Sequence, residues 1–248
     1  MVQTRGSAAP APARDLIAMP NRPRQLALAL DHAESYARED FFTGACNETA
    51  LALIDSWPDW PANAAALVGP EGSGKTHLAM IWAAVAGARI VPGRALREAE
   101  LPAALATGAL VVEDAATDSD DRALFHLLNL AREENAALLL TARDAPASWP
   151  VGIRDLASRL RALPVLTLQA PDDATLRAVI VKLAADRQLA LDESVVGYLC
   201  TRIERSFAAA RAAVIALDRE ALRQRRPPSR ALAAEIFRAD RTTPPSWL

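Results

Sequence analysis

The stretch ALVGPEGSGKTHLAMIWAAVAG, residues 66–87, is the part of the chain that decides the fold. Its first residues are apolar and predict the end of a buried strand. The segment from Gly69 to Thr76 then matches the pattern GxxxxGK[ST], and an Ala-rich helix follows it. A strand, a glycine-rich loop and a helix in this order are the context in which the pattern binds a nucleotide. The alternative is a glycine-rich turn without a ligand.

The residue types of this loop suit phosphate groups. Glycines allow backbone N–H groups to curl around phosphate oxygens, and the start of the following helix adds positive potential. Lys75 would reach the β and γ phosphates, and the Thr76 hydroxyl would ligate Mg²⁺. The nucleotide-binding residues that we predict in this segment are Gly69, Gly72, Ser73, Gly74, Lys75, Thr76 and His77.

Short apolar runs alternate with helical stretches up to about residue 170. We predict strands at AALVG (65–69), ARIV (88–91), ALVVE (109–113), ALLLT (137–141) and VLTLQ (165–169). Buried strands separated by helices form a parallel sheet that is covered on both faces. The predicted fold class is therefore α/β, with a five-stranded parallel sheet.

The segments that flank the sheet are predicted to be helical. EDFFTGACNETALALIDS, residues 39–56, predicts a turn and then an amphipathic helix that Asn47 caps, with Leu51, Leu53 and Ile54 facing inward. After Pro171 the pattern becomes helical only, at 172–188, 192–203, 206–224 and 229–239.

Three parts follow from these patterns. Residues 1–30 are rich in Ala, Pro and Arg, and we expect a flexible tail there, because this composition buries little apolar surface. Residues 31–170 form the predicted nucleotide-binding domain, and residues 171–248 form an all-helical lid domain.

Overall composition limits the possible partners and the compartment. The chain has 28 Lys and Arg against 30 Asp and Glu, so no global positive charge attracts it to nucleic acid or to an anionic membrane. Cys46 and Cys200 lie far apart in the sequence, which argues against a disulfide framework and against a zinc site. No apolar run is long enough to cross a bilayer. We expect a folded cytoplasmic protein.

An acidic pair ends the third apolar run, in ALVVED. Glu113 and Asp114 would stand at the carboxyl end of a strand beside the glycine-rich loop. One carboxylate, assigned to Glu113, would hold the hydrated Mg²⁺, and Asp114 would polarise the attacking water. The alternative is a solvated acidic loop.

Two further candidate catalytic residues lie later in the chain. Thr141 ends the fourth apolar run, where a hydroxyl can orient water or contact the γ-phosphate; alternatively, it only ends the strand. Arg159 and Arg161 occur in DLASRLRALP, at the end of a short predicted helix. An arginine there would face away from the chain's own loop. It could serve as an arginine finger for another subunit's nucleotide, or be an ordinary surface residue.

Taken together, these motifs resemble the AAA+ module of DnaA, the bacterial replication initiator. The resemblance runs from about Glu39 to the C-terminus and rests on FFTGACNETALALID, GPEGSGKTHLA, VVED and LASRL. It implies an AAA+ fold, ATP or ADP with Mg²⁺ as cofactors, a first sensor at Thr141 and an arginine finger at Arg159. Only RTTPPSWL follows the last predicted helix, so we expect no DNA-binding helix-turn-helix domain there.

Within that family the chain is most similar to the Hda group, which promotes ATP hydrolysis on DnaA when bound to the sliding clamp. RQLALAL in the tail is similar to the clamp-binding peptide of that group, although Ala/Leu-rich chains also contain such strings by chance. The resemblance implies DnaA and the sliding clamp as partners, contact with DNA only through the clamp, and possible self-association. The clamp would be bound by Gln25, Leu26, Leu28 and Leu30.

The chain departs from the family pattern at two places. The acidic pair reads Glu then Asp, where AAA+ proteins commonly have Asp then Glu, so we expect misplaced water and weak intrinsic hydrolysis. Ala208 also stands where the family has a second-sensor arginine, which leaves Arg205 and Arg211 as candidate substitutes. Without that arginine, discrimination by the γ-phosphate should weaken, which fits a protein that holds ADP as a structural switch.

Three function classes follow. The first is a regulator of replication initiation that stimulates hydrolysis on DnaA through Arg159. The second is a DNA-associated ATPase or helicase loader, which would need a local basic surface such as Arg223, Arg225, Arg226 and Arg230. The third is a small-molecule P-loop kinase, which the helical C-terminal part and the lack of an obvious acceptor site oppose.

Overall fold

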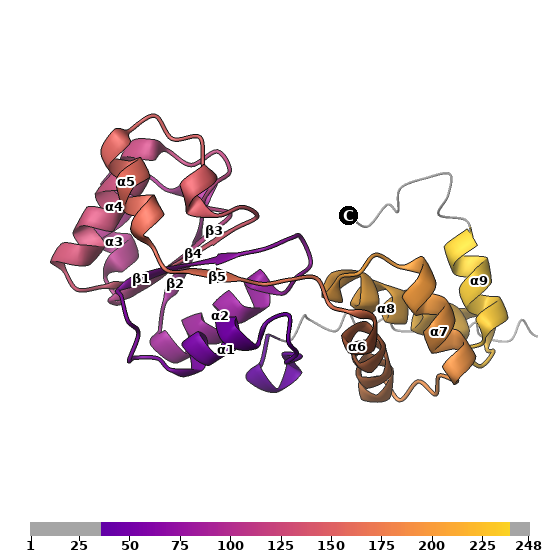
Figure 1. Ribbon diagram of the computed structural model, residues 1–248. Helices are drawn as coiled ribbons and strands as arrows, with labels where there is room; N and C mark the ends of the chain where they lie inside the picture. The colour runs from indigo at the N-terminus through magenta and orange to yellow at the C-terminus, as the bar shows by residue number, and fades with distance from the viewer. Residues whose placement is uncertain (1–35, 239–248) are drawn as a thin grey trace, which may run out of the picture. The chain divides into compact units, whose positions relative to one another are not determined.

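A computed structural model describes residues 36–238, which include a parallel sheet of five strands (Figure 1). The strands are β1 (Ala64–Val68), β2 (Arg89–Pro92), β3 (Ala109–Glu113), β4 (Ala137–Ala142) and β5 (Val165–Thr167). Their order across the sheet is β2-β3-β4-β1-β5, and all four neighbouring pairs are parallel. The predicted sheet is confirmed, and each strand lies within one or two residues of its expected place.

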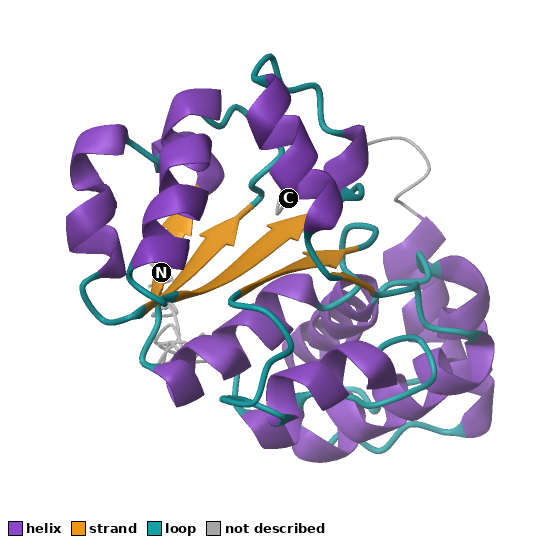
Figure 2. Cartoon of the chain, turned by 60° about the vertical axis from the view of Figure 1, so that its left-hand side comes forward, coloured by secondary structure: helices purple, strands orange, loops and turns teal. Residues whose placement is uncertain are grey.

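Helices cover both faces of this sheet, as Figure 2 shows. On one face pack α1 (Glu48–Asp55) and α2 (Lys75–Ala86); on the other pack α3 (Leu101–Leu105), α4 (Asp121–Glu133) and α5 (Arg154–Ala162). Successive strand residues point to opposite faces, so Leu139 joins the α1/α2 core while Leu138 and Leu140 join the other. Burial on both faces explains why the strands read as continuous apolar runs.

The order of the strands places the motif-bearing ends together. β4 lies between β3, which ends in the acidic pair, and β1, which precedes the glycine-rich loop. Val68 is in register with Ala142, and Val112 is in register with Leu140. The carboxyl ends of these three parallel strands therefore form one edge, which is where open α/β sheets bind ligands.

The chain after β5 is helical, as expected. Its helices are α6 (Asp173–Asp186), α7 (Glu193–Arg202), α8 (Phe207–Gln224) and α9 (Arg230–Arg238), and they pack around their own apolar core. All four start at a side-chain cap, in which the oxygen of Asp172, Asp192, Ser206 or Ser229 accepts a backbone N–H three residues later. Short 3-10 turns occupy Arg38–Asp40, Gly93–Ala95, Glu98–Glu100 and Pro146–Ser148.

Asn47 differs from its predicted role. It stands at the N-cap position of α1, but its side chain makes no cap bond to that helix. Its Oδ1 accepts the Gly44 N–H at 2.9 Å, and its Nδ2 donates to the Phe42 carbonyl at 2.7 Å. The amide therefore holds the preceding loop. Of the residues expected to face inward, Leu51 and Ile54 are buried and Leu53 is half-buried.

Residues 1–35 and 239–248 lie outside the described part of the chain. The tail and its clamp-binding segment, Gln25, Leu26, Leu28 and Leu30, therefore stay predictions. Between residues 36 and 238, no helix has the length and apolar character needed to span a membrane.

Trp82 on α2 should be a main contributor to stability. Its side chain is fully buried, stacks on Trp60 at 4.8 Å between ring centroids, and its indole nitrogen has no hydrogen-bond partner among residues 36–238. Replacing it with alanine should therefore cost about 3–5 kcal/mol, mainly through lost packing. Urea unfolding measures the change. Val85→Ala on the same helix is the control, because Val85 is 68% exposed and should cost less than about 0.5 kcal/mol.

Candidate nucleotide-binding site

The glycine-rich loop connects the end of β1 to the start of α2. Gly72 and Gly74 both have left-handed backbone angles, with φ of 69° and 98°, and Gly74 stands at the N-cap position of α2. A Cβ at Gly72 would lie 2.7 Å from the Cβ of Ser206, and a Cβ at Gly74 would lie 3.4 Å from the ring of Phe41. The backbone conformation therefore favours glycine at both positions, and close packing also requires it at Gly72.

The Lys75 ammonium lies inside the curl of this loop. Its Nζ donates to the carbonyls of Gly69 and Pro70, each at 2.8 Å, and the residue is only 9% exposed. Burial lowers the pKa of Lys75, and the Asp114 carboxylate partly opposes that effect. A buried ammonium bonded only to neutral carbonyls is poised for an anion, because phosphate oxygens would stabilise its charge.

The acidic pair ends β3, beside the loop. Glu113 is half-buried, and its Oε1 is buried without a hydrogen-bond partner among the described residues, whereas Asp114 is exposed and has a φ of 49°. An unsatisfied carboxylate oxygen fits a hydrated cation, which supplies water donors or direct coordination. Thr76 is exposed at the start of α2. Thr76 and Glu113 are therefore the residues that would hold Mg²⁺.

Thr141 is brought to this edge, but it points at the acidic turn. It is 2% exposed, and its Oγ1 accepts the backbone N–H of Asp114 at 3.0 Å. Its carbonyl accepts the N–H of Ala115 at 2.8 Å. Thr141 therefore fixes the turn that carries Asp114.

Arg143 is a charged residue of this edge that the sequence analysis did not select. It follows β4 directly and forms an ion pair with Glu71 of the glycine-rich loop. It also contributes to the lowered pKa of Lys75, although burial of that lysine is the larger cause. Its position two residues after Thr141, at the end of the same strand, was the available sequence signal.

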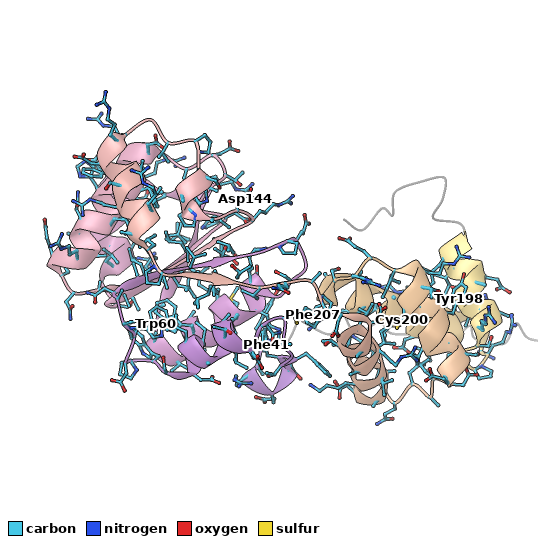
Figure 3. All side chains as sticks on the ribbon, viewed as in Figure 1. Phe41, Trp60, Asp144, Tyr198, Cys200 and Phe207 are labelled. Carbon is cyan, nitrogen blue, oxygen red and sulfur yellow. The ribbon has the colours of Figure 1, made fainter. Side chains whose placement is uncertain are left out.

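Aromatic side chains lie near the start of α2. The His77 ring meets the rings of Tyr36 and Phe41 edge-on, at 5.4 and 5.3 Å between centroids, and its Nε2 lies 3.1 Å from the Ala37 carbonyl. Phe41 and Phe207, labelled in Figure 3, both approach Gly74. Flat apolar rings beside a phosphate loop suit a nucleobase. Of this group, only His77 was predicted from the sequence to bind the nucleotide.

The start of α8 touches the glycine-rich loop. The Phe207 N–H donates to the Gly72 carbonyl at 3.0 Å, and a Cβ at Gly72 would lie 3.3 Å from the Cβ of Ala208. The position expected for a second-sensor arginine is therefore next to the loop, but it carries only a methyl group.

The two candidate substitutes for that arginine have different surroundings. Arg205 is exposed and forms an ion pair with Asp173 at 2.8 Å. Arg211 is half-buried, one turn after Ala208, and makes no side-chain bond within residues 36–238. Side chains on a helix lean toward its N-terminus, so Arg211 is the better placed to extend toward the loop.

Arg159 is not part of this cluster. It lies in the last turn of α5, whose Leu156 and Leu160 pack on the sheet face opposite to α2. Its guanidinium lies over the Phe125 ring, 5.4 Å from the centroid. No carboxylate pairs with Arg159 in the described part of the chain.

Comparison with known proteins gives a fold. No protein-family model matches the chain, and no curated protein matches its sequence. Domain III of Thermotoga maritima DnaA superposes with a TM-score of 0.68 at 18% identity, over 82% of this chain and 96% of that one. AMPPCP-bound DnaA from Aquifex aeolicus superposes with a TM-score of 0.61 at 19% identity, over 77% of this chain and 69% of that one. The Thermotoga maritima RuvB branch migration motor superposes with a TM-score of 0.67 at 16% identity, over 83% of this chain and 72% of that one. The chain therefore has the AAA+ fold.

Replacing Lys75 with alanine tests the site. The variant should bind ATP and ADP about 10- to 100-fold more weakly, because hydrogen bonds to charged groups contribute about 1.5–3 kcal/mol. Isothermal titration with Mg²⁺ present measures both affinities. Arg122→Ala is the control, since Arg122 is an exposed cation on α4. Unchanged affinities in the Lys75 variant would place the nucleotide elsewhere.

Proposed function

We propose that this chain is a negative regulator of replication initiation that acts on the ATP held by DnaA. With ADP or ATP and Mg²⁺ in its own site, and with its tail bound to the sliding clamp, it offers Arg159 to the γ-phosphate of the partner's ATP. The observation that carries the proposal is the position of Arg159, on the sheet face opposite to the helix of the phosphate loop and without a carboxylate partner within residues 36–238.

The surroundings of Arg159 suit a finger that works in trans. Contact with the Phe125 ring restricts the side chain and leaves the planar guanidinium fork free of anionic competition. Such a cation stabilises the charge that develops on the transferred phosphoryl group and is worth about 10³ to 10⁵ in rate in known cases. The main chemistry would then occur on the partner.

The chain's own nucleotide has a structural role in this proposal. AMPPCP is bound in the DnaA structure that shares this fold, and the loop around Lys75 and the orphaned Glu113 oxygen suit the same class of ligand. When bound, Mg²⁺ neutralises phosphate charge. Glu113 and Thr76 would hold it, and Asp114 would polarise water from an exposed turn with little to fix its carboxylate. Intrinsic turnover should therefore be weak.

The second candidate is a DNA-associated ATPase or helicase loader, in keeping with the DnaA structure bound to single-stranded DNA and with the RuvB motor. It needs a basic surface near the end of α8. There, Arg223 is paired with Glu220, whose pKa falls to about 2 mainly through that hydrogen bond, and Arg226 bonds Gln224. The ion pair with Glu220 offsets the charge of Arg223, so we favour the regulator, which would work in the cytoplasm and reach the nucleoid through the clamp.

Arg159→Ala provides the main test. DnaA-ATP hydrolysis is measured on clamp-loaded DNA with and without this protein. The wild-type chain should accelerate hydrolysis, and the variant should lose at least about tenfold of that stimulation, because one charged contact to the transition state is removed. Arg161→Ala is the matched control, since Arg161 lies in the same last turn of α5 and is exposed. Full stimulation by the Arg159 variant would refute the finger. DNA-dependent turnover without any effect on DnaA would favour the second candidate.

Binding of the sliding clamp by the tail is tested separately. Gln25→Ala and Leu28→Ala should each weaken capture of the chain by immobilised clamp about tenfold or more, because each side chain would fill its own subsite. Gln3→Ala is the control, as a glutamine of the same tail outside the motif. If both variants are captured as well as wild type, the tail is not the clamp anchor.

A further inference from the structure

Arg143 occupies the position between the two halves of the nucleotide-binding site. It follows β4, the strand that lies between the phosphate-loop strand β1 and the acidic strand β3. Ala142, directly before it, is in register with Val68, the last residue of β1. The end of β4 therefore lies between the end of β1, where the phosphate loop begins, and the end of β3, where the acidic turn begins.

The Arg143 guanidinium is held by Glu71, which is itself part of the phosphate loop. The two side chains are 70% and 71% exposed. Exposed ion pairs of this kind contribute only about 0–1 kcal/mol, so a polyanion can displace Glu71 easily. Arg143 is thus a cation at the phosphate loop, kept there by a carboxylate that a phosphate can replace.

Neighbouring side chains are less suited to contact a terminal phosphate. The Thr141 oxygen already accepts the Asp114 N–H and is 2% exposed, so it serves the acidic turn. Ala208 carries no charge, Arg205 is held by Asp173, and Arg211 stands one turn farther along α8 than Ala208, the residue that lies against the loop. Glu71, which holds Arg143, is four residues before Lys75 in the same loop, so both cations belong to the phosphate loop's surroundings.

We propose that Arg143 binds the terminal phosphate of a nucleoside triphosphate and that Glu71 competes with that phosphate for the same guanidinium. With a diphosphate bound, Arg143 stays on Glu71; with a triphosphate, it moves to the added phosphate. The inference deepens the proposed function and rests on its claim that this site binds a nucleotide. Competition by Glu71 keeps the preference for triphosphate over diphosphate modest. The partner of Arg143, at the end of β4, then depends on which nucleotide is bound, a role that Ala208 on the lid helix α8 cannot fill.

The test compares the affinities of AMPPCP and ADP, with Mg²⁺, by titration calorimetry of the chain alone. Arg143→Ala should weaken AMPPCP about tenfold and ADP much less, so the ratio of the two affinities falls. Glu71→Gln should raise that ratio severalfold, because it frees the guanidinium. In the double variant the ratio should equal that of Arg143→Ala, since no guanidinium remains to be released.

Two controls sharpen the result. Arg122→Ala should leave the ratio unchanged, and Arg143→Lys should keep part of it, because an ammonium retains the charge but loses the bidentate fork. The proposal is overturned if Arg143→Ala changes both affinities equally or neither, if Glu71→Gln raises the ratio without Arg143, or if the wild-type chain binds no nucleotide. Because DnaA and the clamp are absent, an unchanged ratio rejects Arg143 alone, whereas a lack of DnaA stimulation in the earlier assay rejects the regulator alone.

Discussion

The parallel pairing of β4 with β1 on one side and β3 on the other is the constraint on which the rest of the site depends. Because parallel strands end at the same edge, it aligns the phosphate loop, the end of β4 and the acidic turn. The bond from the Asp114 N–H to the Thr141 hydroxyl joins two of these ends directly. Apolar burial on both faces of the sheet holds the register, since a slip of one residue would turn every strand side chain to the opposite core.

The charges at that edge are arranged around a volume that would hold an anion. Lys75 is buried with only carbonyl partners, and Arg143 is fixed by an exposed and therefore weak ion pair. Glu113 supplies an unsatisfied oxygen where a cation could sit. Each of these groups would gain a better partner if a nucleotide and Mg²⁺ bound there. The site thus contains charged groups whose partners in the folded chain are neutral, weakly bound or absent. Such groups lower the stability of the fold and are typical of functional positions.

The contact of α8 with the loop places residue 208 beside Gly72. The Phe207 N–H bonds the Gly72 carbonyl, and a Cβ at residue 72 would meet both Ser206 and Ala208. A small residue and a glycine therefore meet where the family pattern has an arginine. The nucleotide response of the lid would then depend on backbone contact, and charge recognition would pass to residues on the sheet.

The local sequence alone determined the strands, the phosphate loop and the acidic pair, because apolar periodicity and loop chemistry are encoded by neighbouring residues. Tertiary structure decided the partners of long polar side chains. Arg143 meets Glu71 across 72 positions of sequence, Arg205 meets Asp173, and Asn47 binds the loop before its helix and does not cap it. Such pairings depend on which segments the fold brings together. A long side chain can also reach several different partners by rotation about its bonds. The aromatic group around His77 escaped sequence reasoning for the same physical reason: Tyr36, Phe41 and Phe207 become neighbours only after the chain has folded.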